Sequence, residues 1–287
     1  MPEPTTPLYT DHARTYGENK FVYPVLSRRS RGISIGINLN PDKICNFDCI
    51  YCQVDRRSEA ETRFVEIDRL VEELDGMFHY VASGEIYRDK KFCDVPENLR
   101  RLNDVAFSGD GEPTTYRNFD EIIDQTSELK RKHGLGDVKM VLITNASMFH
   151  RPAVQRSLEI LDRNNGEIWA KLEAGTEEFY KLVERTTIPF RRVLDNIAEA
   201  ARVRPIVIQS LFMRIDGEPP PDLEIKAFCE RLNEIITAGG ELKLVQLYTV
   251  ARKPAESFVT PLSDTELNRL ADTVVRLTKL PVETFGG

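Results

Sequence analysis

The sequence has no long hydrophobic run and no excess of positive charge. None of its apolar stretches approaches the length of about 18 residues that a membrane-spanning helix needs, and its first residues lack the basic-then-apolar order of a secretory signal. We therefore expect a cytoplasmic protein that makes no membrane contact. Lys and Arg number 39 against 46 Asp and Glu, a net charge of −7, which argues against non-specific binding to nucleic acid. The 41% of hydrophobic residues and 30% of charged residues exclude a disordered, collagenous or coiled-coil chain.

Cysteines are few, and their distribution is uneven. There are five in the chain, and residues 1–44 contain none. Cys45, Cys49 and Cys52 lie within eight residues of each other, whereas Cys93 and Cys229 are isolated. An odd number of cysteines without an export signal makes a disulfide framework improbable, and clustering of this kind indicates metal binding or redox chemistry.

Short apolar runs alternate with amphipathic segments along most of the chain. The runs predict strands at 33–39, 105–108, 138–144, 168–173, 206–212 and 242–248. Helices are expected within 65–81 and at 119–133, 153–163, 190–202, 223–238 and 264–278, the last with Ser263 as N-cap and Glu266 at the capping-box position. Strands separated by helices pair in parallel, so the pattern predicts an α/β barrel or an open doubly wound sheet.

One domain accounts for this whole pattern. We assign residues 1–31 to an N-terminal extension and residues 32–287 to the core domain. The stretch at about 83–103 fits neither helical nor strand periodicity, which predicts an inserted loop or short helix and makes it a candidate lid. Functional side chains in such folds gather just beyond the carboxyl ends of the strands.

The segment Cys-Asn-Phe-Asp-Cys-Ile-Tyr-Cys follows the first predicted strand. Spacings of four and three residues between Cys45, Cys49 and Cys52 suit the thiolate ligands of an iron–sulfur cluster, and three ligands leave one position open. A structural zinc site would need a fourth Cys or His nearby, and the four histidines show no matching spacing. The spacing favours an iron–sulfur cluster over zinc or inert thiols.

Other candidate residues follow later strands. The second strand ends in a turn that contains Gly109, Asp110, Gly111 and Glu112, where glycines admit a ligand close to the backbone and a carboxylate can bind an ammonium group. Taken alone, this pattern is weak evidence, because a Gly-rich turn with Asp and Pro is usually an ordinary turn. Further polar side chains at strand ends are Asn145, Lys171, Glu173, Gln209, Ser210, Arg252 and Lys253.

The cysteine segment resembles the CX3CXφC signature of the radical S-adenosylmethionine (SAM) superfamily, with Tyr51 as the aromatic residue φ. The resemblance implies a partial (β/α)6 TIM-like barrel, with a 4Fe-4S cluster held by Cys45, Cys49 and Cys52 and with SAM as a second cofactor. It implies reductive cleavage of SAM to a 5′-deoxyadenosyl radical, which abstracts hydrogen from a substrate. The turn Gly109–Glu112 resembles the superfamily's GGE motif for the SAM amino group, and Asn145 and Glu173 match later positions that contact SAM. The resemblance assigns no catalytic residue, and it implies an electron donor such as flavodoxin or ferredoxin.

Several segments resemble the branch that contains tRNA 4-demethylwyosine synthase: Ser-Arg-Arg before the first strand, Phe-Ser-Gly-Asp-Gly-Glu-Pro-Thr, Lys-Leu-Glu-Ala-Gly and Gln-Leu-Tyr-Thr-Val-Ala-Arg-Lys-Pro. Relatives in this branch carry a second iron–sulfur cluster on cysteines that precede the SAM motif, and a lysine that forms a Schiff base. This chain has no cysteine before Cys45, and neither Lys20 nor Lys43 matches that lysine well. We therefore expect a radical SAM enzyme with one cluster. Its acidic charge disfavours a tRNA substrate.

Alternative functions remain open at the level of sequence. They are a tRNA guanosine-modifying enzyme, an activase of a glycyl-radical enzyme, an iron–sulfur electron carrier or sensor, and a zinc-stabilised scaffold. Among the remaining candidates, Cys229 and Trp169 are expected in the core, and Cys93 in the insert. Two basic groups flank the cysteine segment and could bind an anionic substrate, namely Arg28-Arg29-Arg31 and Arg56-Arg57, whereas Lys130-Arg131-Lys132 is expected on a solvated helix face.

Overall fold

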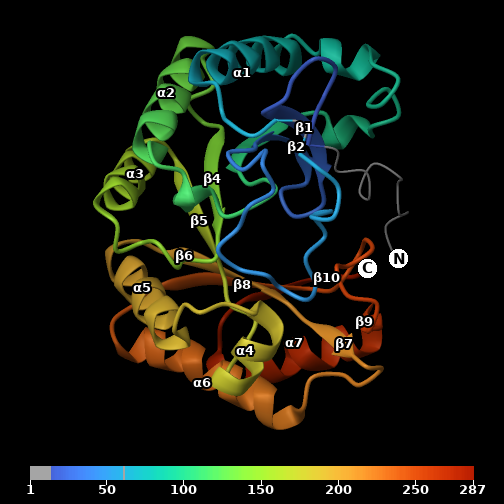
Figure 1. The fold of residues 1–287 in the computed structure, drawn as a ribbon, viewed down its shortest axis with the longest axis vertical. Coiled ribbons are helices and arrows are strands. Elements are labelled where there is room, and N and C mark those ends of the chain that lie inside the picture. The colour runs from blue at the N-terminus through green and yellow to red at the C-terminus, as the bar shows by residue number, and fades with distance from the viewer. Residues whose placement is uncertain (1–13, 61) are drawn as a thin grey trace. The chain divides into compact units, whose positions relative to one another are not determined.

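The computed structural model describes residues 14–60 and 62–287, which form two compact units. Among the described residues, the first unit comprises 14–44, 59–60, 62–142 and 152–167, and the second comprises 45–58, 143–151 and 168–287. Each unit contains strands and helices, which Figure 1 labels along the chain. No helix of the described residues is both long and apolar enough to span a membrane.

The first unit is built on the strand order β1-β2-β3-β4. Strand β1 (Val22–Ser27) runs antiparallel to β2 (Gly32–Ile37), whereas β2, β3 (Leu102–Phe107) and β4 (Lys139–Thr144) are parallel neighbours. All six residues of β2 are buried, as expected for a strand covered on both faces. Helix α1 (Ile67–Ala82) contacts α2 (Phe119–Lys132), and α2 contacts α3 (Pro152–Arg163).

The second unit contains the strand order β5-β6-β8-β10. Its parallel strands are β5 (Gly166–Lys171), β6 (Ile206–Leu211), β8 (Leu242–Tyr248) and β10 (Val282–Phe285). A short antiparallel pair, β7 (Met213–Ile215) and β9 (Val259–Pro261), follows their carboxyl ends. The helices are α4 (Glu177–Glu184), α5 (Phe190–Val203), α6 (Asp222–Thr237) and α7 (Asp264–Thr278).

The six predicted strands and six predicted helices are all present, with ends that differ by up to three residues. The capping box of Ser263 and Glu266 at the start of α7 is confirmed. Cys229 and Trp169 are buried as predicted, with exposed fractions of 1% and 6%, and Cys93 is exposed.

Strands β1, β7, β9 and β10 and helix α4 were not predicted. Strand β1 lies within residues 1–31, which were predicted to be an N-terminal extension, and it contains Pro24. Proline removes a backbone donor and is tolerated on an edge strand, and β1 stands at the end of its strand order. Helix α4 has only eight residues and β10 only four, too few for a clear period.

The irregular insert at 83–103 contains two short 3-10 helices, η2 (Glu85–Arg88) and η3 (Glu97–Leu99), before β3 begins at Leu102. Ile86 and Phe92 within it are completely buried. The prediction of a short helix is therefore confirmed in part.

Lys130 corrects the prediction of a solvated basic face on α2. Its side chain is 1% exposed, and its Nζ donates hydrogen bonds to the carbonyl oxygens of Gly136, Val138 and Asn164 at 3.2, 2.5 and 2.8 Å. Three carbonyl acceptors compensate for the cost of burying the ammonium group. Lys132 keeps the expected solvent exposure and pairs with Asp75 at 2.9 Å.

Candidate functional site

The cysteine segment is a loop of the second unit whose backbone is tied to the end of α4. The amide of Asp48 donates to the carbonyl of Glu184 at 3.1 Å, and the amide of Ile50 donates to Val183 at 2.9 Å. Ile50 and Tyr51 are buried in an apolar cluster with Val183, Leu211, Met213, Val250 and Val259. These contacts fix the residues between the cysteines. The three thiols themselves are half-buried and form no disulfide.

Asn145, a predicted cofactor-binding residue, holds this loop to the end of β4. Its Nδ2 donates to Oδ1 of Asn46 at 2.9 Å, and its Oδ1 accepts from the amide and hydroxyl of Ser147 at 3.1 and 2.6 Å. Asn46 also donates to the Ser147 hydroxyl at 2.8 Å, and its carbonyl accepts from Thr186 at 3.0 Å. Asn46 lies between Cys45 and Cys49, so this network positions the loop directly.

The predicted turn Gly109–Glu112 follows β3 in the first unit, and both glycines are required by close neighbours. A Cβ atom on Gly109 would overlap Oδ1 of Asn38, and one on Gly111 would overlap the carbonyl oxygen of Ile44, the residue before Cys45. Asn38 is 2% exposed and follows β2. Adjacent strand ends are therefore in direct contact at this turn, as expected for parallel strands.

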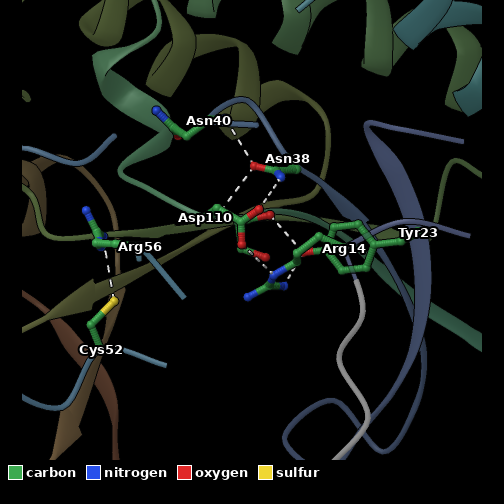
Figure 2. A network of polar contacts seen from close by, with 8 residues as sticks. Arg14, Tyr23, Asn38, Asn40, Cys52, Arg56 and Asp110 are labelled. Carbon is green, nitrogen blue, oxygen red and sulfur yellow. Dashed lines mark hydrogen bonds and ion pairs between the residues drawn. The ribbon is translucent and has the colours of Figure 1, made fainter. Parts of the chain in front are cut away.

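Asn38 is hydrogen-bonded to both sides of the turn. Its Oδ1 accepts from the amides of Asn40 at 3.0 Å and Asp110 at 3.1 Å, while its Nδ2 donates to the Asp110 carboxylate at 2.8 Å (Figure 2). Arg14 adds an ion pair of 3.6 Å to the same carboxylate and lies 5.0 Å from the ring centre of Tyr23. The Tyr23 hydroxyl in turn donates to the carbonyl of Ser108 at 2.9 Å.

Glu112 is buried, with an exposed fraction of 3%. Its Oε1 accepts from the amide and hydroxyl of Thr114 at 3.2 and 2.5 Å and so caps the 3-10 helix η4 (Pro113–Thr115). The cap orients the carboxylate before any ligand binds. An oriented carboxylate of this kind fits an ammonium group of a cofactor. Within the second unit, the three thiols on the anchored loop suit an iron–sulfur cluster.

Comparison with known families agrees with this chemistry. The model described as "Radical SAM superfamily" matches residues 39–229 of the 287. The chain belongs to the radical SAM superfamily. Members of this superfamily use a 4Fe-4S cluster and SAM, and they typically need a reductant.

Individual relatives are distant. A protein of Brachyspira hyodysenteriae named GTPase Obg is 26% identical over 251 residues, which are 86% of this chain and 32% of that protein. The chain thus spans about a third of the length of this relative.

Two solved structures show the fold. A radical SAM methyltransferase from Sphaerobacter thermophilus has a TM-score of 0.62 at 14% identity, covering 92% of this chain and 69% of its own. TYW1 with a lysine–pyruvate adduct bound has a TM-score of 0.53 at 16% identity, covering 86% of this chain and 74% of its own. The predicted α/β fold, a partial (β/α)6 TIM-like barrel, is confirmed, as is the resemblance to the wyosine synthase branch.

The buried ion pair of Lys171 and Glu173 lies beside the cysteine loop. Lys171 Nζ pairs with Glu173 at 2.9 Å, donates to the Tyr248 hydroxyl at 2.9 Å, and lies 4.8 Å from the ring centre of Tyr51. Glu173 has an exposed fraction of 3%. Burial acts to lower the pKa of Lys171, but the charges of Glu173 and Tyr248 raise it well above its usual value. Lys171 is therefore a protonated partner of Glu173 and not a free nucleophilic amine.

Glu184, at the end of the unpredicted helix α4, is the acidic neighbour of Cys49. The Cys49 thiol donates to Oε2 of Glu184 at 2.7 Å. Burial raises the pKa of Cys49, and the Glu184 carboxylate raises it further; burial and then Glu173 raise the pKa of Glu184. The surroundings of Cys49 therefore favour its neutral thiol until a cation or cluster compensates the thiolate charge. Among the described residues no group of three or more His, Cys, Asp and Glu side chains is placed to hold a single metal ion.

Within the second unit, the structure brings together Cys45, Cys49, Cys52, Tyr51, Asn145 and Glu173. Other candidates have structural partners. Gln209 is buried and donates to Gln246 at 3.1 Å, and Gly175 packs against the backbone of Ala227 and Phe228. Glu184, Asn46 and Asn38 were not predicted as site residues. Asn46 lies inside the cysteine segment and Asn38 near the end of the first predicted strand, which was the available signal, whereas Glu184 depends on a helix too short to detect.

Proposed function

We propose that this chain is a radical SAM enzyme with one cluster and that Cys45, Cys49 and Cys52 are the iron ligands. When bound, the cluster and SAM supply reductive cleavage to methionine and a 5′-deoxyadenosyl radical, which takes hydrogen from the substrate. The observation that carries the proposal is the double anchoring of the cysteine loop, by α4 through Asp48 and Ile50 and by Asn145 through Asn46. A loop without a ligand to position has no need of a buried polar network between its cysteines.

The remaining site residues are assigned to SAM. Gly109 and Gly111 let the backbone approach the cofactor closely, and the oriented carboxylate of Glu112 suits its ammonium group. Asp110 is a nearby residue whose carboxylate already pairs with Asn38 and Arg14. Tyr51 and Asn145 shape the loop, and Glu173 suits the ribose hydroxyls.

The reductant we propose is a flavodoxin or a ferredoxin, because the cluster must receive one electron before SAM is cleaved. A reducing compartment such as the cytoplasm suits three thiols that must stay reduced to bind iron. No substrate is assigned.

The test is anaerobic reconstitution with iron and sulfide, followed by electron paramagnetic resonance with and without SAM and by measurement of 5′-deoxyadenosine. We expect about four irons per chain, a spectrum that changes on addition of SAM, and reductive formation of 5′-deoxyadenosine. Cys45→Ala, Cys49→Ala and Cys52→Ala should each abolish these signals, whereas Cys93→Ala, at the exposed cysteine, should retain them. A spectrum that ignores SAM, with no 5′-deoxyadenosine, would favour an electron carrier or sensor.

The second candidate function is modification of a tRNA guanosine, which the likeness to TYW1 in fold favours. The net charge of −7 and the lack of cysteine in residues 1–44 weigh against it, because relatives of that branch carry a second cluster on cysteines that precede the SAM motif. Retention of tRNA by the reconstituted protein, decreasing steeply between about 50 and 200 mM salt, would support this function. Retention that does not depend on salt, or no retention, would exclude it.

A further inference from the structure

Arg56 lies against two of the three loop thiols. Its Nη2 donates to Sγ of Cys52 at 3.6 Å (Figure 2), and the guanidinium also interacts with Cys45. The guanidinium is always positively charged, so the contact is electrostatic and not only steric.

The neighbours of the three thiols divide into an acidic side and a basic side. Cys49 faces the carboxylate of Glu184 at 2.7 Å, whereas Cys52 faces the guanidinium of Arg56. Lys171, which also lies near the loop, is paired with Glu173 at 2.9 Å, so its charge is largely compensated. Arg56 is in direct contact with the sulfur of Cys52.

A cation that donates hydrogen bonds to cluster sulfurs changes the energetics of reduction. The reduced cluster carries one more negative charge than the oxidised cluster, so N–H···S bonds and nearby positive charge stabilise it and raise its reduction potential. Arginine suits this role because its guanidinium stays protonated and presents several donors in a fixed fork that can contact two sulfurs.

We propose that Arg56 tunes the reduction potential of the cluster by hydrogen bonding to the sulfurs of Cys45 and Cys52. The inference rests on the proposed function, because it requires these cysteines to hold the cluster. In this role Arg56 acts through the cysteines, so it is a positioning residue. By raising the potential, it would bring the cluster within reach of a weaker one-electron donor.

The test is a redox titration of the reconstituted protein, monitored by electron paramagnetic resonance, for wild type, Arg56→Gln, Arg56→Lys and Arg57→Gln. Arg57 is the matched control, because it is the adjacent, exposed residue and the substitution removes the same charge. We expect Arg56→Gln to lower the equilibrium constant for reduction by about tenfold or more, which is about 59 mV for one electron. Arg56→Lys keeps the positive charge but loses the forked N–H donors of the guanidinium. The reduction potential of its cluster should therefore lie between those of wild type and Arg56→Gln.

Failure of this inference can be distinguished from failure of the proposed function. Iron content and the change of the electron paramagnetic resonance spectrum on addition of SAM are measured first on the wild type. If either is absent, the proposed function is wrong, and the role of Arg56 is wrong with it. If both are present and Arg56→Gln titrates at the wild-type potential, or Arg57→Gln shifts the potential equally, the role of Arg56 is wrong and the enzyme assignment stands. If Arg56→Gln does not retain a cluster, the reduction potential of Arg56→Lys is the deciding measurement. A potential below that of wild type supports the inference, and a potential equal to that of wild type overturns it.

Discussion

Asn145 donates a 2.9 Å hydrogen bond to Asn46, joining the carboxyl end of β4 to the loop that carries the three clustered cysteines. Asn145 has an exposed fraction of only 6%, so little water is available to replace a lost partner. The residue that sequence reasoning places against the cofactor therefore contacts the ligand loop itself.

Asn145→Ala should weaken retention of iron. Leaving the Asn46 oxygen without its donor costs about 1–3 kcal/mol, which loosens the loop more than the unit as a whole. The measurement is iron per chain after reconstitution at limiting iron, together with thermal unfolding. Asn164→Ala, which removes a 2.8 Å hydrogen bond to Ile160 elsewhere, is the control and should leave iron content unchanged. Equal iron content in both variants would contradict the positioning role.

Gly111→Ala should weaken SAM binding, because the new methyl group would overlap the carbonyl oxygen of Ile44 and displace the turn. Overpacking of this kind costs about 1–3 kcal/mol, or roughly fivefold to more than a hundredfold in affinity if borne at the site. Titration of the reconstituted protein with SAM measures the effect. Gly136→Ala meets no atom within 4 Å and should bind SAM normally. A Gly111→Ala protein with wild-type affinity would show that the turn does not serve SAM.

Cys229 should make stability depend on pH in the alkaline range. Burial in the core raises the pKa of its thiol from about 9 to about 11, so the native state holds a proton that the unfolded state loses first. Its contribution is fully present below pH 9 and is lost as the pH rises towards 11. Cys229→Ala should be less stable than wild type by about 1 kcal/mol at pH 8, and the difference should narrow by pH 10.5. Urea unfolding of wild type and Cys229→Ala at both pH values measures the difference in the free energy of unfolding. A difference that stays the same from pH 8 to pH 10.5 would contradict the prediction.

Lys130→Met should destabilise the first unit without changing the iron content of the reconstituted protein. Three carbonyl oxygens, those of Gly136, Val138 and Asn164, would lose their shared donor, at a cost of about 1–3 kcal/mol. Lys132→Met removes an exposed ion pair with Asp75 and should cost no more than about 1 kcal/mol. Denaturant unfolding of the two variants distinguishes a buried donor from a solvated charge. If both variants lose a similar free energy of unfolding, the buried hydrogen bonds of Lys130 contribute no more to stability than the exposed ion pair of Lys132.

Much of the fold follows from local pattern. Parallel strands such as β6 and β8 are short apolar runs buried along most of their length, and α7 carries its own start signal in Ser263 and Glu266. Strand β1 and helix α4 lack such signals. Both depend on partners distant in sequence: β1 on β2 and on Glu73, whose carboxylate accepts from the amide of Phe21 at 2.8 Å, and α4 on Glu224, which accepts from the Thr176 hydroxyl at 2.6 Å.

The sequence by itself predicted the chemistry of this protein, because three thiols at spacings of four and three suit an iron–sulfur ligand set. Only the tertiary structure decided which groups act on those thiols. Glu184 lies 135 residues from Cys49, and Asn145 lies 99 residues from Asn46, so no local pattern could pair them. Local spacing selects the ligands, whereas the electrostatic environment of each sulfur comes from contacts that form only when distant segments pack together.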